Sequence, residues 1–246
     1  MHVAVLGNRG SWYCNELRRA AESRGHRYSR VDFPSLTAGL GLDGPTLSAD
    51  ELDLTSVDAV VVRTMPPGSL EQVVFRMDAL ARLEAAGVAV LNSPKAIECA
   101  VDKYLTTARL AAAGLTVPAT IVCENAEAAQ EAFERLGGDV VVKPVFGSEG
   151  RGILRVSNPD LALRTFRTLE RINAVLYLQR FIEHDGTDIR VLILDGRILG
   201  AIRRCSEDDF RTNVSRNGRA ESYSPSEEEQ QMALKAAAIV GAQFAG

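Results

Sequence analysis

The sequence predicts an α/β N-terminal domain with a small parallel sheet, followed by a second domain of the α+β class. Over about the first ninety residues, short apolar strands alternate with amphipathic helices. This order is typical of a mostly parallel sheet with helices on both faces. From residue 117 onward the strands follow one another more closely, and Asp195-Gly196 is a two-residue hairpin signal between two of them. Antiparallel pairs are therefore expected in the second domain.

The boundary between the domains is expected near Asn92. Ser93 and Pro94 have the residue types of a helix N-cap and of the first helical position, so a new unit begins there. We therefore divide the chain into residues 1–92 and 93–246.

In the first domain, four runs of small and branched apolar residues predict strands at 2–6, 27–33, 58–64 and 88–92. One helix is predicted before Gly25, and another begins at a capping box made by Ser69 and Gln72. The apolar faces expected for the two helices consist of Trp12, Leu17, Ala20 and Ala21, and of Leu70, Val73, Val74, Met77, Leu80 and Ala81. Residues 34–56 are rich in Gly, Pro, Ser and Asp, which predicts a long loop.

The second domain mixes helices and strands. Helical patterns cover residues 94–114, 125–136, 159–171 and 226–243, and the last of these opens on a capping box of Ser226 and Glu229. Strands are predicted at 119–123, 140–146, 152–156, 175–182, 188–194 and 197–204.

Composition excludes several classes of function. The formal net charge of −4 gives no basic surface for nucleic acid, and no apolar run approaches the ~18 residues of a membrane span. The N-terminus lacks the pattern of a signal peptide. The four cysteines and three histidines are scattered, which argues against a zinc site and favours free thiols in a cytoplasmic protein.

Lysine is rare in this chain, so each lysine is informative. The 28 basic residues comprise 24 Arg and four Lys, and Lys143 lies in VVVKPVFGSEGRGI, ahead of Gly147, Gly150 and Gly152. Glycines let backbone amides approach an anion and let a loop flex. The stretch alone fits a hairpin tip better than a phosphate lid. Lys103, the strand-to-loop segment 177–184 and the Arg-rich hairpin 187–213 shift the balance towards a lid.

Two motifs of the first domain leave their alternatives open. GNRGSW follows a strand and opens a helix, where amides can hold an anion, but a plain turn explains it better. Arg63 lies at the carboxyl end of the predicted strand 58–64, an end that would face a ligand crevice, so it is a candidate for binding a substrate carboxylate. A surface arginine before the Pro-Pro turn is equally compatible with the sequence.

These motifs resemble the ATP-grasp fold, and within it the RimK-type carboxylate–amine ligases, which add L-glutamate to a ribosomal protein or to coenzymes. The resemblance covers most of the chain and is carried by SPKAIECAVDKYLTTARLAAAGLTVPAT, VVVKPVFGSEGRGI, LQRFIEHDGTDIRVLILDG and DFRTNVSRNG. RTMPPGSLEQVVFRMDALARLEAAG also resembles the branch associated with tetrahydromethanopterin. The first domain would then be a pre-ATP-grasp domain, the second an ATP-grasp domain with a lid subdomain at about 105–178.

The resemblance implies roles for individual residues. Lys103 and Lys143 match lysines that contact ATP phosphates, and the lid matches the loop formed by Gly147, Ser148, Glu149, Gly150 and Gly152. The adenine hinge matches Gln179, Arg180, Phe181 and Ile182, mostly through backbone. Asp188 matches a ribose contact. Anion-binding or catalytic positions match Arg190, Arg203, Arg211, Thr212 and Asn213.

The resemblance also implies ATP and magnesium or manganese as cofactors, and as partners a small-molecule or protein carboxylate acceptor plus an amino acid. It does not decide whether the protein forms a homo-oligomer. This chain differs from many relatives in having Arg180 where they have Glu. The part at 179–246 is expected to be incomplete, because the family's acidic and Asn magnesium ligands follow the helix at 226–243 and no metal ligand is found here. The reaction implied is ATP-dependent amide formation through an acyl phosphate; the alternative is an ATP-binding module without catalysis.

Overall fold

The structure, a computed structural model, describes residues 1–246 except 43, 148–149, 207–208 and 213–217. The chain divides into two compact units, Met1–Glu98 and Cys99–Gly246. Each unit has its own hydrophobic core, and each is described separately below.

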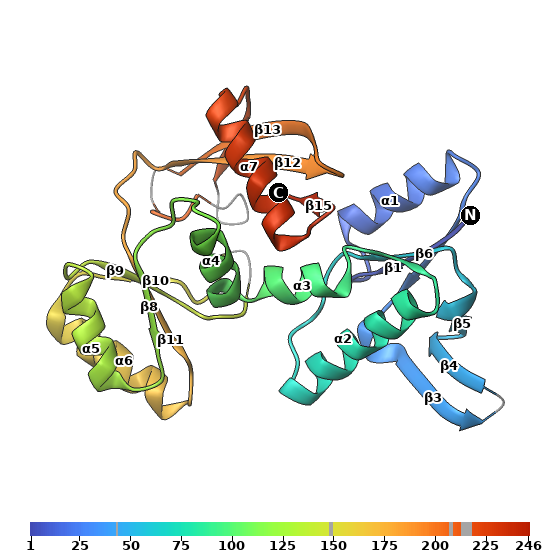
Figure 1. The fold of residues 1–246 in the computed structure, drawn as a ribbon, viewed down its shortest axis with the longest axis horizontal. Coiled ribbons are helices and arrows are strands. Elements are labelled where there is room, and N and C mark those ends of the chain that lie inside the picture. Colours follow the sequence, from blue (N-terminus) through green and yellow to red (C-terminus); the bar gives the residue numbers. More distant parts are fainter. Residues whose placement is uncertain (43, 148–149, 207–208, 213–217) are drawn as a thin grey trace. The chain divides into compact units, whose positions relative to one another are not determined.

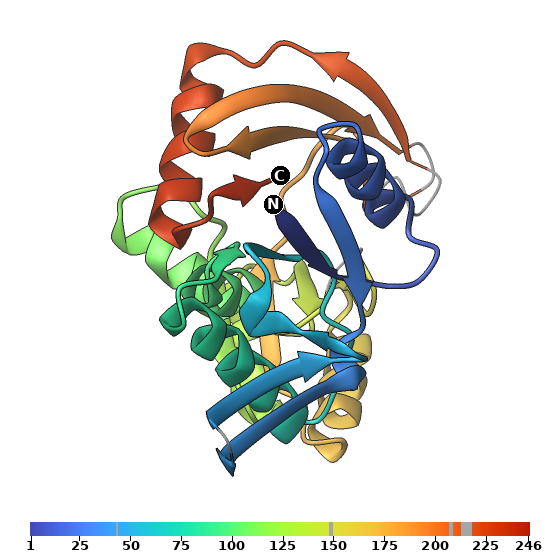
Figure 2. The same cartoon turned by 90° about the vertical axis from the view of Figure 1, so that its right-hand side faces the viewer.

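A parallel sheet forms the centre of the N-terminal unit, as the sequence predicts. It has the order β2-β1-β6-β7, with bounds β1 His2–Leu6, β2 Arg27–Val31, β6 Ala59–Val62 and β7 Ala89–Leu91. Helices α1 (Trp12–Glu22) and α2 (Leu70–Ala85) lie on opposite sides of the sheet (Figures 1 and 2). Side chains alternate along β1, so Ala4 and Leu6 are buried in one core with Leu80 and Leu83 of α2.

The loop predicted at 34–56 is wrong, because this segment folds into a second, antiparallel sheet. A short 3₁₀ turn, Phe33–Ser35, precedes the strands β3 Leu36–Leu42, β4 Gly44–Ala49 and β5 Leu52–Asp53. Another 3₁₀ turn, Leu54–Ser56, follows them. The segment contributes buried side chains to the core of the unit, namely Leu36, Leu47, Ala49 and Leu54. Their burial offsets the turn-forming composition that suggested a loop.

The apolar faces predicted for α1 and α2 are partly wrong. The side chain of Trp12 is 67% exposed, and α1 buries Cys14 instead. In α2, Leu70 and Val74 are exposed, whereas the buried positions are Arg76, Ala79, Leu80 and Leu83. The capping box of Ser69 and Gln72 is confirmed.

The C-terminal unit begins with two helices, α3 Pro94–Val101 (which starts in the N-terminal unit) and α4 Lys103–Ala112. An antiparallel sheet follows, in the order β10-β9-β11-β8. Its bounds are β8 Thr120–Cys123, β9 Val140–Lys143, β10 Leu154–Val156 and β11 Leu176–Arg180. One face packs on α5 Ala126–Arg135 and α6 Pro159–Arg171 around Phe133 and Phe166 (Figure 1).

A second antiparallel sheet completes this unit, in the order β14-β13-β12-β15. Its bounds are β12 Thr187–Leu194, β13 Arg197–Cys205, β14 Arg219–Tyr223 and β15 Phe244–Ala245. Asp195 and Gly196 both have positive φ, as the predicted hairpin requires. Helix α7 (Glu227–Val240) lies beside the long strands in Figure 2 and begins at the predicted capping box.

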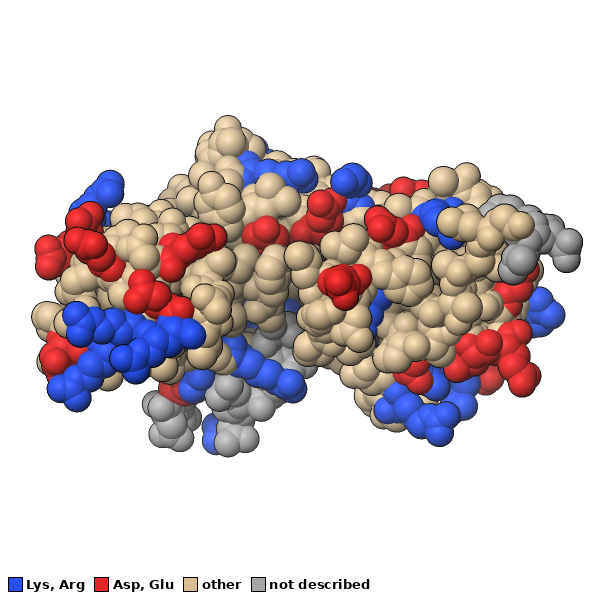
Figure 3. Space-filling view, turned by 90° about the horizontal axis from the view of Figure 1, so that it is seen from below, with Lys and Arg blue, Asp and Glu red and all other residues tan. Residues whose placement is uncertain are grey.

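The surface carries no large region of one charge on the face that Figure 3 shows. Basic and acidic side chains are interspersed there, which agrees with the small net charge. Among the residues with described structure, no helix is both long and apolar enough to cross a membrane.

Candidate functional site

Two lysines form the centre of the candidate site in the C-terminal unit. Lys103 is the first residue of α4, and Lys143 is the last residue of β9. Burial lowers the pKa of Lys143, and the nearby charge of Lys103 lowers it further. Burial also lowers the pKa of Lys103, against the opposing effect of Asp102. A phosphate chain would relieve both effects, because it supplies the negative charge that two partly buried cations lack.

A network of neutral groups positions Lys143. Its Nζ donates to Oε1 of Gln179 at 2.6 Å. The amide nitrogen of Gln179 donates to the hydroxyls of Thr120 at 2.9 Å and Tyr177 at 3.2 Å, and the Tyr177 hydroxyl lies 2.9 Å from that of Thr107. Because Gln179 is buried and its amide is fully engaged, we interpret it as a positioning residue for Lys143.

The register of the sheet explains why this network lies on one face. Tyr177 pairs with Lys143, and Gln179 lies two residues further along β11, so both point to the same side. The alternate residues, Leu176 and Leu178, point to the opposite side and into the core with α5 and α6. Lys143 therefore lies on the polar face of the sheet, opposite the face that packs in the core.

The glycines of the predicted lid adopt conformations that favour glycine. Gly147, Gly150 and Gly152 have φ of 132°, 70° and 71°. Lys103 reaches this loop, since its Nζ donates to the carbonyl oxygen of Gly147 at 2.8 Å and, at 3.4 Å, to that of Val145. Ser148 and Glu149, the other predicted loop residues, lie outside the described part of the chain.

The predicted hinge follows directly after β11. The N–H of Arg180 donates to the carbonyl oxygen of Ala119 at 2.8 Å, and that of Phe181 to Asp139 at 3.0 Å. Both amides are thus used inside the protein. No hydrogen bond joins the N–H of Ile182 to another described residue, so this amide is the one available to an adenine edge. The guanidinium of Arg180 donates to the carbonyl oxygen of Leu136 at 3.1 Å, away from a direct ligand role.

Asp188 forms a closed cluster with Arg204 and Thr212. Arg204 donates to both carboxylate oxygens, at 2.7 and 2.5 Å, and the hydroxyl of Thr212 donates to one of them at 2.6 Å. Partial burial raises the pKa of Asp188, but these hydrogen bonds outweigh it and hold the pKa below its usual value. A ribose contact at Asp188 would have to share oxygens that are already occupied.

The structure separates two of the predicted anion-binding arginines. Arg190 pairs with Ile202 and Arg203 pairs with Ile189, so the two guanidinium groups leave opposite faces of the sheet. Arg203 lies 4.6 Å from the ring centroid of Tyr223 and 3.5 Å from Glu221. Arg190 donates to the backbone oxygen of Gly246 at 3.2 Å. One anion cannot contact both arginines in this arrangement.

Arg211 contacts both an acidic neighbour and the glycine loop. It forms an ion pair with Asp209 at 2.6 Å, and its Nη1 lies 3.5 and 3.4 Å from the carbonyl oxygens of Gly150 and Ile153. These contacts place the segment at Arg211 and Thr212 against the loop that follows Lys143. Asn213, the third predicted residue of that segment, lies outside the described residues.

Arg63, the predicted substrate residue, belongs to the N-terminal unit. Its guanidinium carbon lies 4.0 Å from the ring centroid of Tyr13, so the side chain is stacked on α1. It does not line the cavity described next.

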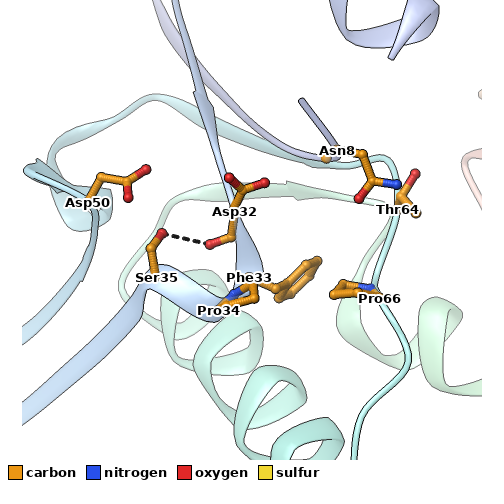
Figure 4. Close-up of a pocket in the computed structure, with 9 residues that line it drawn as sticks. Asn8, Asp32, Phe33, Pro34, Ser35, Asp50, Thr64 and Pro66 are labelled. Atoms are coloured by element: carbon orange, nitrogen blue, oxygen red, sulfur yellow. Dashed lines mark hydrogen bonds between the residues drawn. The ribbon is translucent and has the colours of Figure 1, made fainter. Parts of the chain in front are cut away.

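A cavity of about 430 Å³ opens at the carboxyl ends of β1, β2 and β6 (Figure 4). We call it the carboxyl-end cavity, and its lining consists of Gly7, Asn8, Asp32, Phe33, Pro34, Ser35, Asp50, Thr64 and Pro66. Asp32 and Asp50 were not predicted as site residues. A signal for Asp32 existed, because it lies at the carboxyl end of the predicted strand 27–33, just as Arg63 lies at the carboxyl end of 58–64. Asp50 had no such signal, since its segment was predicted to be a loop.

No protein-held metal site can be assigned. Within the part of the chain that the structure describes, no three His, Cys, Asp or Glu side chains come together as metal ligands. Asp188 and Asp209, two acidic residues of the C-terminal unit, are each paired with an arginine.

Known families match both units. The RimK PreATP-grasp domain matches residues 1–97, and the RimK-like ATP-grasp domain matches residues 100–246. The tetrahydromethanopterin:alpha-L-glutamate ligase of Methanosarcina acetivorans is 38% identical over 255 residues, covering 96% of this chain and 77% of its own length. The ribosomal protein bS6–L-glutamate ligase of Escherichia coli O139:H28 is 30% identical over 250 residues, covering 100% and 82%.

Solved structures of ligases have the same fold. The ATP-grasp ligase PsnB, complexed with a minimal precursor, Mg and ADP, matches with a TM-score of 0.72 at 25% identity, covering 98% of this chain and 82% of PsnB. D-cycloserine synthetase DcsG matches with a TM-score of 0.72 at 20% identity, covering 100% and 84%. The second likeness supports the fold alone.

Proposed function

Because the chain belongs to the RimK-like ATP-grasp family, we propose that it adds L-glutamate to an acceptor carboxylate through an acyl phosphate. As a member of this family it is a ligase that forms a C–N bond. The amino substrate, the acceptor and the intermediate are the parts that we propose.

The proposed reaction has two steps. An acceptor carboxylate oxygen attacks the γ-phosphorus of ATP, the bond to the bridging oxygen breaks, and ADP leaves with that electron pair. The amino group of glutamate then attacks the acyl carbon and releases inorganic phosphate, and the nitrogen loses a proton as the amide forms. Both steps depend mainly on positioning and on neutralising charge at the phosphoryl oxygens.

The lysine pair, Lys103 and Lys143, is the observation that carries this proposal. Two cations that repel each other, one at the end of β9 and one at the start of α4, fit a polyphosphate, and Gln179 fixes Lys143 without neutralising it. In our proposal the glycine loop covers the phosphates, residues 105–178 act as the lid subdomain, and the free N–H of Ile182 binds adenine. Arg211 would follow the loop, because it already contacts the loop backbone.

We also propose roles for Asp188 and Arg190. Asp188 holds Arg204 and Thr212 in place beside the triphosphate, and its contact with a ribose hydroxyl shares an oxygen with these groups. Arg190 and Asp188 are two residues apart on one strand and therefore share a face, so Arg190 is the better candidate for an anion.

Magnesium would accompany ATP, but the described residues offer no set of ligands for it. We therefore assign no step to a metal held by this chain.

Glutamate is proposed because relatives named as L-glutamate ligases share 30–38% identity with most of the chain. The acceptors in their names differ, since one is named for tetrahydromethanopterin and the other for ribosomal protein bS6. The higher identity to the first favours a pterin-containing coenzyme as the acceptor of this chain.

ADP release should reveal the activity. We expect ADP to appear only when ATP, magnesium, L-glutamate and a competent acceptor are all present, and mass spectrometry should find the acceptor heavier by one glutamyl group. Lys143→Ala should weaken ATP binding by at least about 1.5 kcal/mol, or more than tenfold, because a charged hydrogen bond is lost. Lys235→Ala, which removes an exposed lysine of α7, is the matched control.

Two results would contradict the proposal. Clear ATP binding without turnover on any pterin-containing coenzyme or ribosomal-protein acceptor would favour an ATP-binding module. Equal ATP affinity in Lys143→Ala and Lys235→Ala would remove the lysine pair from the nucleotide site.

A further inference from the structure

The carboxyl-end cavity lies where an open α/β sheet is built to bind a ligand. Its lining follows β1, β2 and β6, which are neighbours in the order β2-β1-β6-β7. The chain runs from β1 to β2 on one side and returns to β6 on the other, so the strand order reverses beside β1. Ligands of such sheets bind outside the carboxyl ends of the strands at this reversal. A volume of about 430 Å³ suits a small molecule.

Arginines on two sides hold the walls of the cavity in place. Nη1 of Arg30 donates to Oδ1 of Asp32 at 2.6 Å and to the carbonyl oxygen of Gly7 at 3.1 Å, which joins the ends of β1 and β2. Arg76, a buried residue of α2, donates to the carbonyl oxygen of Pro66 at 2.7 Å and lies 5.8 Å from the ring centroid of Phe33. The loops that carry the lining are therefore fixed before any ligand arrives.

Hydrogen-bond acceptors dominate the polar part of the lining. Asp32 uses one oxygen for Arg30, and no described residue bonds to its second oxygen or to the carboxylate of Asp50. Arg30 lies near both carboxylates, since the hydrogen bond that it donates to Asp32 raises the pKa of Arg30 and the charge of Asp50 adds to the effect. The two carboxylates are balanced in charge by the two wall arginines, Arg30 and Arg76, so the unused carboxylate oxygens favour N–H donors of an uncharged ligand.

Another part of the lining is apolar. In Figure 4 the polar side chains Asp50, Asp32, Asn8 and Thr64 lie along the upper row, and the rings of Phe33, Pro34 and Pro66 lie below them. A flat ring can rest on this part of the lining while one edge meets the carboxylates. An amidine edge, in which a ring N–H adjoins an exocyclic NH₂, presents two parallel donors to a carboxylate, as an arginine does.

From this geometry we infer that the carboxyl-end cavity binds a nitrogen-rich, uncharged heterocycle through an amidine edge facing Asp32 and Asp50. This ring belongs to the acceptor, so the inference rests on the proposed function and narrows its substrate class. It assigns no ATP phosphate and no glutamate carboxylate to the cavity.

Pterin and lumazine are the probes that test the inference with the full chain and without ATP. They share the fused ring, but lumazine has an oxygen in place of the exocyclic amino group. We expect calorimetric titration to detect pterin binding. Lumazine should bind at least about tenfold more weakly than pterin, because it lacks one donor to a carboxylate. Asp32→Asn and Asp50→Asn should each weaken pterin binding about tenfold and reduce the preference over lumazine.

Controls separate this inference from folding and from the proposed function. Asn tolerates the positive φ of Asp50, so Asp50→Asn should keep the melting temperature of the wild type. Asp78→Asn, which removes a carboxylate of α2 outside the cavity lining, should bind pterin as the wild type does. Because neither probe requires turnover, a failure of ADP release would not affect the result. Equal affinity for pterin and lumazine, no binding of pterin, or unchanged binding in both cavity variants would each overturn the inference.

Discussion

The lysine pair and the carboxyl-end cavity hold charged groups for ligands in opposite ways. Lys143 is fixed by the amide oxygen of Gln179, a neutral acceptor, and its nearest charge is that of another lysine. Asp32 is fixed by the guanidinium of Arg30, a full opposite charge, but only one of its oxygens is used. The positive charge of the lysine site is therefore not neutralised by its positioning partner. In the cavity, the charge of Asp32 is paired with Arg30, and the second carboxylate oxygen of Asp32 is left for a ligand.

This difference fits the ligands that we assign to the two regions. A polyphosphate carries several negative charges, and it gains most from cations that have not been neutralised. An uncharged heterocycle needs acceptors in a fixed direction more than it needs a strong field. A neutral partner for Lys143 thus suits a polyphosphate ligand, and a charged partner for Asp32 suits an uncharged heterocycle.

Gln179→Glu tests the comparison most directly, because it gives Lys143 the charged partner that Asp32 already has. The new carboxylate should compete with phosphate, and we expect ATP to bind about tenfold more weakly near neutral pH. The pH dependence should change too. ATP affinity of the wild type should fall as the pH rises through the lowered pKa of Lys143, below its ordinary value of 10.5. In Gln179→Glu this fall should move to higher pH, because a carboxylate raises the pKa of a lysine.

Calorimetric titration of ATP across this pH range measures both effects. Gln243→Glu introduces the same charge at an exposed position of the same unit and should leave ATP affinity nearly unchanged. If Gln179→Glu lowered the affinity without moving the pH profile, Gln179 would have a structural role only.

A second comparison concerns two Asp–Arg pairs, Asp32–Arg30 in the cavity and Asp188–Arg204 in the C-terminal unit. Asp188 uses both oxygens, whereas Asp32 uses one. We therefore expect Asp188→Asn to destabilise the protein by about 1 kcal/mol, a low value because the carboxyl is partly exposed. Asp32→Asn should cost less stability and affect ligand binding instead.

The pH dependence of stability distinguishes the two pairs. The pKa of Asp188 is depressed in the folded protein, so its contribution is present above its ordinary value of 3.8 and is lost as the pH falls through the folded-state value. The difference in unfolding free energy between wild type and Asp188→Asn should accordingly vanish in acid. Urea unfolding at neutral and acidic pH measures it. A difference that persists below the folded-state pKa would show that the substitution disturbs packing and not charge.

The sequence predicted what depends on local chemistry. Strand β1 and the capping boxes at Ser69 and Ser226 appear as expected, because a few neighbouring residues determine each of them. The hairpin within 34–56 was not predicted, because its strands are stabilised by burying Leu47 and Leu54 in a core formed by distant segments. Propensity is weakest where tertiary packing decides the structure.

The candidate sites follow the same division. The sequence identified the two lysines and the glycine loop, but it did not reveal the partnership of Lys143 with Gln179, because that contact depends on the register between β9 and β11. It also placed Arg190 and Arg203 together, although the pleat of the sheet separates them. The carboxyl-end cavity is assembled from four turns, and no single turn carries a motif.

The glycine loop allows a final and smaller test of how the lysine site is built. Gly152 has a φ of 71°, whereas Gly200 of β13 has no positive φ and open space around it. We expect Gly152→Ala to destabilise the protein by about 1 kcal/mol, because alanine is strained in the left-handed region. Gly200→Ala should be neutral or slightly stabilising, because alanine loses less entropy on folding. If both variants unfold at the same urea concentration, the positive φ of Gly152 is not required for the stability of the folded chain.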